Sequence, residues 1–192
     1  VAIIAPKSSG ADWSLPNSPS RARGAAPVDE LVYFDQLLDD VIRRFDIDPE
    51  RIVAAGFSAG GMMVWTLACH RSSRFAGFVP MAGTFWQPVP ASCSRPPASI
   101  FHIHGDSDPI VPFRGRPIGP AHQGDVGEAL AMYATYGRFG AARRISRKDL
   151  RCDRRQNPTG NILEFCQFSG GHTFNPEYLR QAWDAIIPPS GQ

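Results

Sequence analysis

The sequence contains a serine in a setting that suits a nucleophile. Ser58 lies in the pattern G-x-S-x-G, formed by residues 56–60. A run of β-branched and small residues precedes it, and an apolar, helix-like run from Met62 to Ala68 follows it. The pattern predicts a strand, a sharp turn and a helix, with the Ser58 hydroxyl standing clear of the sheet edge. The alternative is a glycine-rich turn in which Ser58 only caps the helix.

Two further residues could complete the chemistry that a nucleophilic serine needs. A serine hydroxyl becomes reactive when an imidazole takes its proton, and a carboxylate fixes the imidazole and stabilises its charged form. His172 follows two glycines, whose backbone freedom would let the ring be aimed, and we expect it to be the general base and acid. Asp108 is the expected carboxylate. The alternatives are an ordinary turn histidine at 172, a turn-forming aspartate at 108, and Asp106 as the acid instead.

The backbone of the serine turn could stabilise the negative charge that develops during acyl transfer. A helix that begins behind Ser58 presents unpaired N–H groups and the positive end of its dipole. We expect the N–H of Ala59 to face the oxyanion. This chemistry requires no cofactor and no metal ion. His102 and His104 alternate along a predicted strand, and we interpret both as structural residues satisfied by hydrogen bonds, because the chain offers no matching metal-ligand cluster.

Hydrophobic periodicity predicts the elements that would position these residues. The predicted strands are 1–5, 52–55, 75–82, 99–104 and 162–168, and the predicted helices are 31–45, 62–68, 125–136 and 178–187. Strands that alternate with helices predict a parallel sheet in an α/β layer structure, whose sites lie at the carboxyl ends of the strands. Ser58, Asp108 and His172 each follow a predicted strand, so we expect them to meet at one edge of the sheet.

Composition places the chain among ordinary globular proteins. It has 192 residues, enough for one domain with a substantial core, and 43% of them are hydrophobic. The net charge of +2 indicates no strong preference for polyanions. The stretch from Arg138 to Arg155 is basic but lacks interleaved aromatic residues, so we interpret it as a solvated face and not as a nucleic-acid site. No apolar run is long enough to cross a membrane.

Four cysteines without C-x-x-C spacing argue against a zinc or redox pair. They are Cys69, Cys93, Cys152 and Cys166. An even count fits two disulfides, and three pairings are open. Nearest-neighbour pairing would close two modest loops, each worth ~3 kcal/mol, and would imply an oxidising compartment. The alternative is four reduced, buried thiols.

Three motifs carry a resemblance to a known family. They are residues 56–63 (GFSAGGMM), residues 104–112 (HGDSDPIVP) and residues 170–174 (GGHTF). They resemble the polyhydroxybutyrate depolymerase and feruloyl/acetylxylan esterase group of α/β-hydrolases, and the resemblance extends from about Val1 to Phe174. It implies an α/β-hydrolase three-layer sandwich with a mostly parallel sheet. It also places the catalytic acid on Asp108 and not on Asp106.

The resemblance adds further expectations. Family members are commonly secreted or periplasmic and disulfide-bonded, with cysteines near Cys69 and Cys93, which favours the pairs Cys69–Cys93 and Cys152–Cys166. Phe174 and Tyr133 each stand at a position where the family usually has tryptophan. Family members also have an earlier strand that lies in the sheet between the strands beginning at 1 and 52. The loop after that earlier strand gives the second oxyanion N–H. We therefore expect residues 1–192 to form one α/β-hydrolase domain that lacks its N-terminal strands.

The leading hypothesis is a serine ester hydrolase that forms an acyl-enzyme with a small or polymeric ester outside the cell. Polyhydroxyalkanoate, feruloyl, acetyl and short-chain acyl esters all remain open as substrates. The alternatives are a serine peptidase of the same fold and a catalytically silent binding module. Four aromatic residues in loops could line the substrate cleft or could serve packing: Trp13, Phe85, Trp86 and Phe113. No nucleic acid or membrane is expected as a partner.

Overall fold

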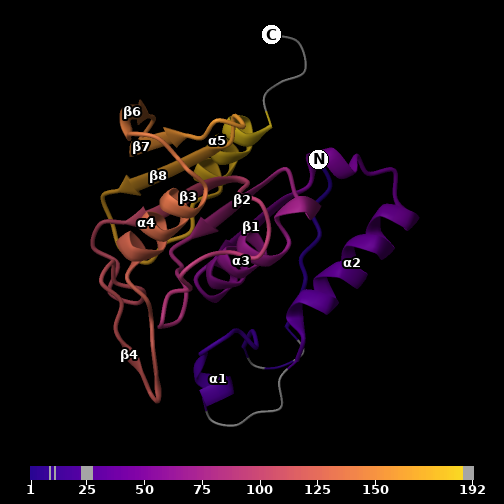
Figure 1. Ribbon diagram of the computed structural model, residues 1–192, viewed down its shortest axis with the longest axis horizontal. Helices are drawn as coiled ribbons and strands as arrows, with labels where there is room; N and C mark the ends of the chain where they lie inside the picture. Colours follow the sequence, from indigo (N-terminus) through magenta and orange to yellow (C-terminus); the bar gives the residue numbers. More distant parts are fainter. Residues whose placement is uncertain (9, 11, 23–27, 188–192) are drawn as a thin grey trace.

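The computed structural model describes residues 1–8, 10, 12–22 and 28–187, and its centre is a six-stranded sheet (Figure 1). In sheet order the strands are β1 (Val53–Phe57), β2 (Gly77–Met81), β3 (Ser99–Gly105), β8 (Ile162–Phe168), β7 (Leu150–Gln156) and β6 (Arg143–Arg147). The first four run parallel, and β7 and β6 are antiparallel to their neighbours. Two short strands, β4 (Pro117–Ile118) and β5 (Ala121–His122), form a separate hairpin.

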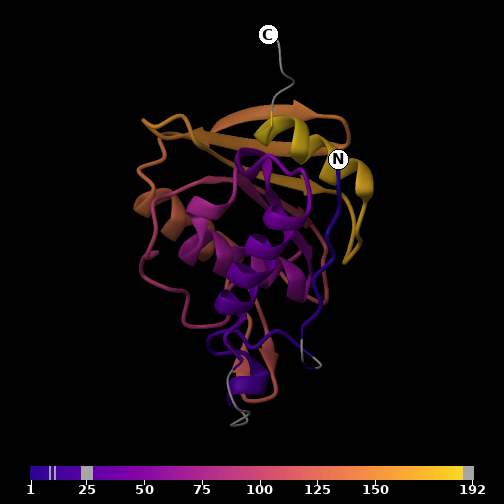
Figure 2. The same cartoon turned by 90° about the vertical axis from the view of Figure 1, so that its right-hand side faces the viewer.

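Helices cover both faces of this sheet and complete three layers. They are α1 (Pro19–Ala22), α2 (Glu30–Arg44), α3 (Ala59–His70), α4 (Val126–Tyr136) and α5 (Pro176–Ile186), with short 3-10 helices at Pro49–Arg51 (η1) and Ser72–Arg74 (η2). One hydrophobic core, around Trp65 of α3 and Tyr133 of α4, lies between these two helices and the sheet. The second core, around Phe101 and Ala182, lies under α5. Figure 2 shows α5 along the sheet, on the side away from α2 and α3.

The predicted helices are present because apolar spacing and capping agree. In α2, Phe34, Leu38 and Val41 recur at helical spacing and are buried, while the Asp29 side chain accepts hydrogen bonds from the first-turn N–H groups. Asp125 caps α4 and Asn175 caps α5 in the same way. None of the helices among the described residues combines the length and the apolar character that a membrane crossing requires.

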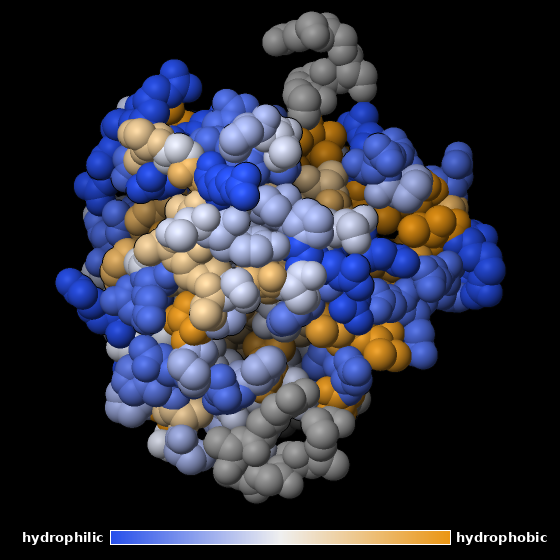
Figure 3. Space-filling view, viewed as in Figure 1, coloured by the Kyte–Doolittle hydropathy of each residue, from blue (hydrophilic) through white to orange (hydrophobic). Residues whose placement is uncertain are grey.

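The predicted first strand is wrong. Residues 1–8 form neither helix nor strand, and Ile3 and Ile4 are 86% and 46% exposed. In the sheet order β1 is an edge strand that pairs only with β2. An apolar, β-branched run has the composition of a strand, but a strand also needs a neighbour that supplies its hydrogen bonds and buries its side chains. Figure 3 shows apolar side chains exposed on the right-hand side, over α2 and the N-terminal segment.

The basic stretch from Arg138 to Arg155 is more than the solvated face that we predicted. Much of it forms the antiparallel strands β6 and β7. Arg144 and Arg151 are largely exposed, as predicted. Arg147 and Arg154, however, reach across to the fully buried carboxylate of Glu164 on β8, each at 2.5 Å. Strands whose faces carry long charged side chains lack the hydrophobic alternation that marks most strands, so periodicity missed them.

This buried ion cluster gives a stability prediction. We expect Glu164→Gln to lower the free energy of unfolding by about 3 kcal/mol, because two partly buried guanidinium groups lose their shared counter-charge. Urea unfolding followed by far-UV circular dichroism measures the change. The matched control is Asp153→Asn on the same hairpin, whose pair with Arg144 is exposed and should cost about 0.5 kcal/mol or less. Equal losses in the two variants would contradict the assignment.

Two disulfides join segments that are close in the fold. The structure joins Cys69 to Cys93 and Cys152 to Cys166, which confirms the nearest-neighbour pairing and the disulfides that the resemblance implies. The first connects the end of α3 to the loop before β3. The second links directly opposed residues of β7 and β8. Neither contributes a free thiol for chemistry.

Candidate active site

The turn between β1 and α3 holds Ser58 in a strained backbone conformation. Its φ of 58° and ψ of −120° lie in a region that residues with a side chain rarely adopt, at a cost of about 1–3 kcal/mol. Ser58 occupies the N-cap position of α3, yet its side chain makes no capping hydrogen bond. Its backbone N–H donates to the carbonyl of Met81 at the end of β2, which ties the turn to the sheet. The hydroxyl is therefore not used to cap the helix, contrary to the alternative considered for the sequence.

Close backbone contacts at this turn leave no room for side chains. A Cβ on Gly56 would lie 2.3 Å from the carbonyl oxygen of Gly60, and one on Gly61 would lie 2.6 Å from that of Met81. A Cβ on Gly60 itself would meet nothing within 4 Å. The motif predicts Gly56 and Gly60 as the two small residues that let strand and helix approach. In the structure the requirement falls on Gly56 and Gly61, because the residue at 60 points to open space.

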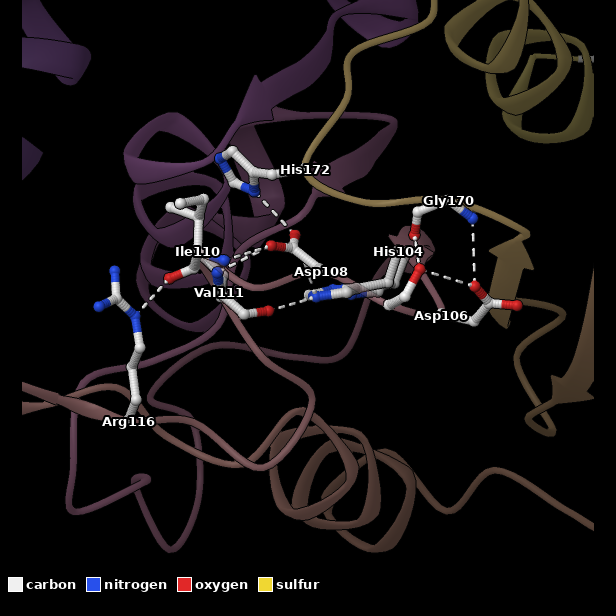
Figure 4. Close-up of polar contacts among 10 residues, drawn as sticks. His104, Asp106, Asp108, Ile110, Val111, Arg116, Gly170 and His172 are labelled. Carbon is white, nitrogen blue, oxygen red and sulfur yellow. Dashed lines mark hydrogen bonds and ion pairs between the residues drawn. The ribbon is translucent and has the colours of Figure 1, made fainter.

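Asp108 lies in the loop that follows β3, and its carboxylate is held on both oxygens. The side chain is fully buried. Its Oδ1 accepts the backbone N–H groups of Ile110 and Val111 at 2.8 and 2.9 Å. Its Oδ2 lies 2.7 Å from Nδ1 of His172 (Figure 4). The turn hydrogen bonds considered as an alternative for Asp108 are thus present on one oxygen, and the other oxygen is aimed at the histidine.

His172 lies just past β8, and its ring is held between Asp108 and the end of β1. Its Nδ1 faces the Asp108 carboxylate, so Nε2 is the nitrogen left for proton exchange. The ring centroid lies 4.5 Å from that of Phe57, the residue that precedes Ser58. The side chain is 15% exposed, which leaves it reachable from solvent. The structure therefore brings Asp108 and His172 into contact beside the turn that carries Ser58.

Asp106 does not face His172 but joins the two loops that carry Asp108 and His172. It accepts the N–H of Gly170 at 3.1 Å and an N–H of Arg151 at 2.8 Å. The pKa of Asp106 lies below its usual range, mainly because of the hydrogen bond from Gly170 and secondly because of the charge and hydrogen bond of Arg151. The sequence predicts local turn bonds for Asp106. The structure contains one local bond, from the Ser107 hydroxyl at 3.4 Å, and adds the longer-range bonds to β7 and to the turn after β8.

The glycine at the end of β3, Gly105, leaves no room for a side chain against the turn that precedes His172. A Cβ on Gly105 would lie 2.3 Å from the carbonyl oxygen of Gly171 and 2.4 Å from that of Gly170. We expect Gly105→Ala to push His172 away from Asp108 and to lower kcat for an ester about 100-fold, since misplacement by about 1 Å has effects of that size. The control is Gly140→Ala, where the new Cβ meets only ordinary contact at 3.5 Å. Initial rates with p-nitrophenyl acetate test this expectation, and similar rates in both variants would refute it.

His102 and His104 are fully buried on β3 and are hydrogen-bonded, as the structural interpretation predicts. Burial, together with the neighbouring His104, lowers the pKa of His102 well below its usual value. Burial also lowers the pKa of His104, against the opposing effect of its hydrogen bond to Val111. Both rings are therefore neutral near pH 7.

The four aromatic residues predicted to line a cleft have packing contacts in the structure. The Trp13 ring lies 5.6 Å from Phe34 of α2. Phe85 and Trp86 are each only 8% exposed and belong to the core under α3. The ring of Phe113 lies 5.7 Å from that of Phe165 on β8. Substrate contact by these residues stays a prediction.

Two exposed apolar residues close in sequence to His172 and Asp108 received no site role in the sequence analysis. Phe174 and Ile110 are both 46% exposed, and the ring of Phe174 lies 6.1 Å from that of Phe57. Their positions, two residues from His172 and two from Asp108, were the available signal. Hollows of about 540 and 620 Å³ lie elsewhere, beside His70 and beside His122, and neither is lined by Ser58, Asp108 or His172. Exposed apolar side chains thus lie next to the candidate acid and histidine in the sequence.

A strained serine turn between strand and helix, an acid after one parallel strand and a histidine after another define the α/β-hydrolase class. Solved structures agree on the fold. An acetyl xylan esterase from Aspergillus awamori superposes with a TM-score of 0.60 at 13% identity, covering 81% of this chain and 67% of that one. The Bacillus cereus carboxylesterase gives a TM-score of 0.52 at 16% identity, covering 84% of this chain and 63% of that one.

Sequence comparison supplies the family. Residues 17–118, more than half of the chain, match the phospholipase/carboxylesterase family, and the chain belongs to that family of α/β-hydrolases. The putative esterase NocK of Nocardia uniformis subsp. tsuyamanensis is 33% identical over 118 residues, which cover 60% of this chain and 33% of NocK. Feruloyl esterase C of Emericella nidulans is 26% identical over 115 residues, which cover 59% and 37%. The chain thus spans about a third of the length of these curated relatives.

Proposed function

We propose that the protein is a serine carboxylic-ester hydrolase in which Ser58, His172 and Asp108 form the catalytic triad. The observation that carries the proposal is the contact of 2.7 Å between Asp108 and His172 beside the Ser58 turn. A second support is that the Ser58 hydroxyl is not used as a helix cap. The family and the names of the relatives support an ester as substrate.

In the proposed mechanism Ser58 Oγ attacks the carbonyl carbon of the ester while Nε2 of His172 takes the hydroxyl proton. The negative charge on the carbonyl oxygen is stabilised by the N–H of Ala59 at the start of α3. His172 then gives the proton to the leaving alcohol, and an acyl-enzyme remains on Ser58. Water activated by the same nitrogen releases the acid and restores the serine. Asp108 holds the ring and stabilises its charged form throughout.

The acyl group and the location belong to the same proposal. One relative is named a feruloyl esterase, and another, of Neocallimastix patriciarum, is named a bifunctional acetylxylan esterase/xylanase, 29% identical over 82 residues that cover 43% of this chain and 12% of that protein. These names favour a feruloyl or acetyl ester among the candidate substrates. The two disulfides favour an oxidising location outside the cytoplasm.

Hydrolysis of p-nitrophenyl acetate, combined with labelling by a fluorophosphonate, tests the proposal. We expect turnover, and we expect the label on the peptide that carries Ser58 after digestion and mass spectrometry. Cleavage of peptide anilides without ester turnover would favour a peptidase. A folded protein whose Ser58 stays unlabelled would favour a binding module without catalysis.

A further inference from the structure

Two buried histidines form a continuous hydrogen-bonded chain beneath the candidate site. His102 and His104 project from β3 toward the side of α3, and their rings are nearly parallel, 6° apart in orientation and 5.3 Å between centroids. Nε1 of Trp65 on α3 lies 3.2 Å from Nδ1 of His102. Nε2 of His102 lies 3.1 Å from Nδ1 of His104. Nε2 of His104 lies 2.8 Å from the carbonyl oxygen of Val111, in the loop that holds Asp108 (Figure 4).

The two ends of this chain determine where its protons lie. A carbonyl oxygen only accepts, so Nε2 of His104 carries a proton and donates it to Val111. An indole N–H only donates, so Nδ1 of His102 accepts from Trp65 and Nε2 of His102 carries the proton. The bond between the rings then runs from Nε2 of His102 to Nδ1 of His104. All donors point the same way, and each ring is neutral with one tautomer.

The hydrogen-bonded chain of histidines ends at Val111, the residue that also holds the candidate acid. Val111 accepts from His104 through its carbonyl and donates through its N–H to Oδ1 of Asp108. Ile110 donates to the same oxygen, which leaves Oδ2 for His172. Nε2 of His104 also lies 3.7 Å from Oδ2 of Asp108, too far for a hydrogen bond but in direct contact across the buried site. The position of the Asp108 carboxylate therefore depends on a loop that His104 anchors from below.

We infer that His104, supported by His102 and Trp65, is a positioning residue that holds the Asp108 loop so that the second carboxylate oxygen faces His172. The inference rests on the proposed function for its catalytic consequence. The same hydrogen-bonded chain connects α3, which begins next to Ser58, to the loop that carries Asp108. The candidate nucleophile and the candidate acid are therefore held by one connected set of hydrogen bonds. The titratable groups that face His104 are His102, Asp108 and His172. A phenyl ring could fill this volume, but it could not bond to Val111.

Two polar substitutions separate positioning from packing. Glutamine can place an N–H near the position of Nε2, whereas the shorter asparagine reaches only the position of Nδ1. We expect His104→Gln to keep the bond to Val111 and kcat for p-nitrophenyl acetate within about threefold of wild type. We expect His104→Asn to lose that bond and to lower kcat about 30-fold, within the 100-fold that a misplacement of about 1 Å can cause. The acid limb of its pH–rate profile should move to lower pH, because a displaced carboxylate stabilises the imidazolium less. KM should change less than threefold in both variants.

A spectroscopic signal makes the result independent of turnover. The Nδ1 proton of His172, bonded to Asp108, should give a far-downfield proton resonance in wild type and in His104→Gln, and this resonance should be lost or shifted in His104→Asn. Equal kcat, pH profile and resonance in the two folded variants would overturn the inference. If wild type shows the resonance but no turnover and no label on Ser58, the proposed function fails while the positioning role stands. If His104→Asn does not fold, Trp65→Phe decides through the same resonance and pH profile. This variant removes the far donor and also shrinks a fully buried side chain, so it is measured on folded protein. An unchanged resonance and profile in that variant would also overturn the inference.

Discussion

Hydrolysis of p-nitrophenyl acetate by the Ser58→Ala variant is expected to fall by about 10⁴- to 10⁶-fold relative to wild type, as in other enzymes that lose a serine nucleophile. The physical reason is that, in the proposed mechanism, the acyl group is carried by the Ser58 hydroxyl, which alanine lacks. The fold should be unaffected, because the Ser58 side chain makes no capping bond and alanine tolerates the same φ of 58° no worse than serine. Steady-state rates and thermal unfolding measure the two effects separately.

The matched control is Ser146→Ala, at an exposed position on the edge strand β6. It should keep both rate and melting temperature. Activity that survives in Ser58→Ala would mean that the ester is hydrolysed elsewhere on the protein, and the triad assignment would then be wrong. A loss of activity together with a large drop in melting temperature would instead assign a structural role to Ser58.

Asp108→Asn should lower kcat by about 10⁴-fold while leaving the fold intact. The structure gives the reason in detail. Oδ1 of Asp108 accepts two backbone N–H groups, so the amide oxygen of asparagine must take that place. Its NH₂ group then faces Nδ1 of His172 and donates to it. That donation moves the ring proton to Nε2, which is the nitrogen that must accept the proton of Ser58.

Asp106→Asn is the comparison that identifies the acid. Asp106 binds Gly170 and Arg151 and does not face His172, so its loss should loosen the loops and reduce kcat by no more than about tenfold. The pH–rate profiles of Asp108→Asn and Asp106→Asn are compared from about pH 5 to 9, because a histidine titrates in this range. If the larger loss falls on Asp106→Asn, the roles of the two aspartates have been exchanged.

Much of the fold could be predicted because its signals are local. The strand, glycine turn and helix around Ser58 are adjacent in the sequence, and their apolar spacing and glycines specify them without distant help. The same holds for α2, whose capping aspartate and buried face are also adjacent. Where the signal required a partner, prediction failed. Residues 1–5 have a strand's composition but no neighbour, and β6 and β7 are held by pairing and by Glu164, not by hydrophobic alternation.

The candidate site divides in the same way. The order of residues was enough to predict that Ser58, Asp108 and His172 would each follow a strand, and a parallel sheet places such residues along one edge. The folded chain was needed to establish that Oδ2 of Asp108 faces His172, that Asp106 bonds across to Gly170, and that His104 anchors the acid loop. These are contacts between residues up to 64 positions apart, and some depend on single hydrogen bonds. The motifs favoured Asp108 as the acid, but the direction of each hydrogen bond is fixed by packing in three dimensions, which the order of residue types does not specify.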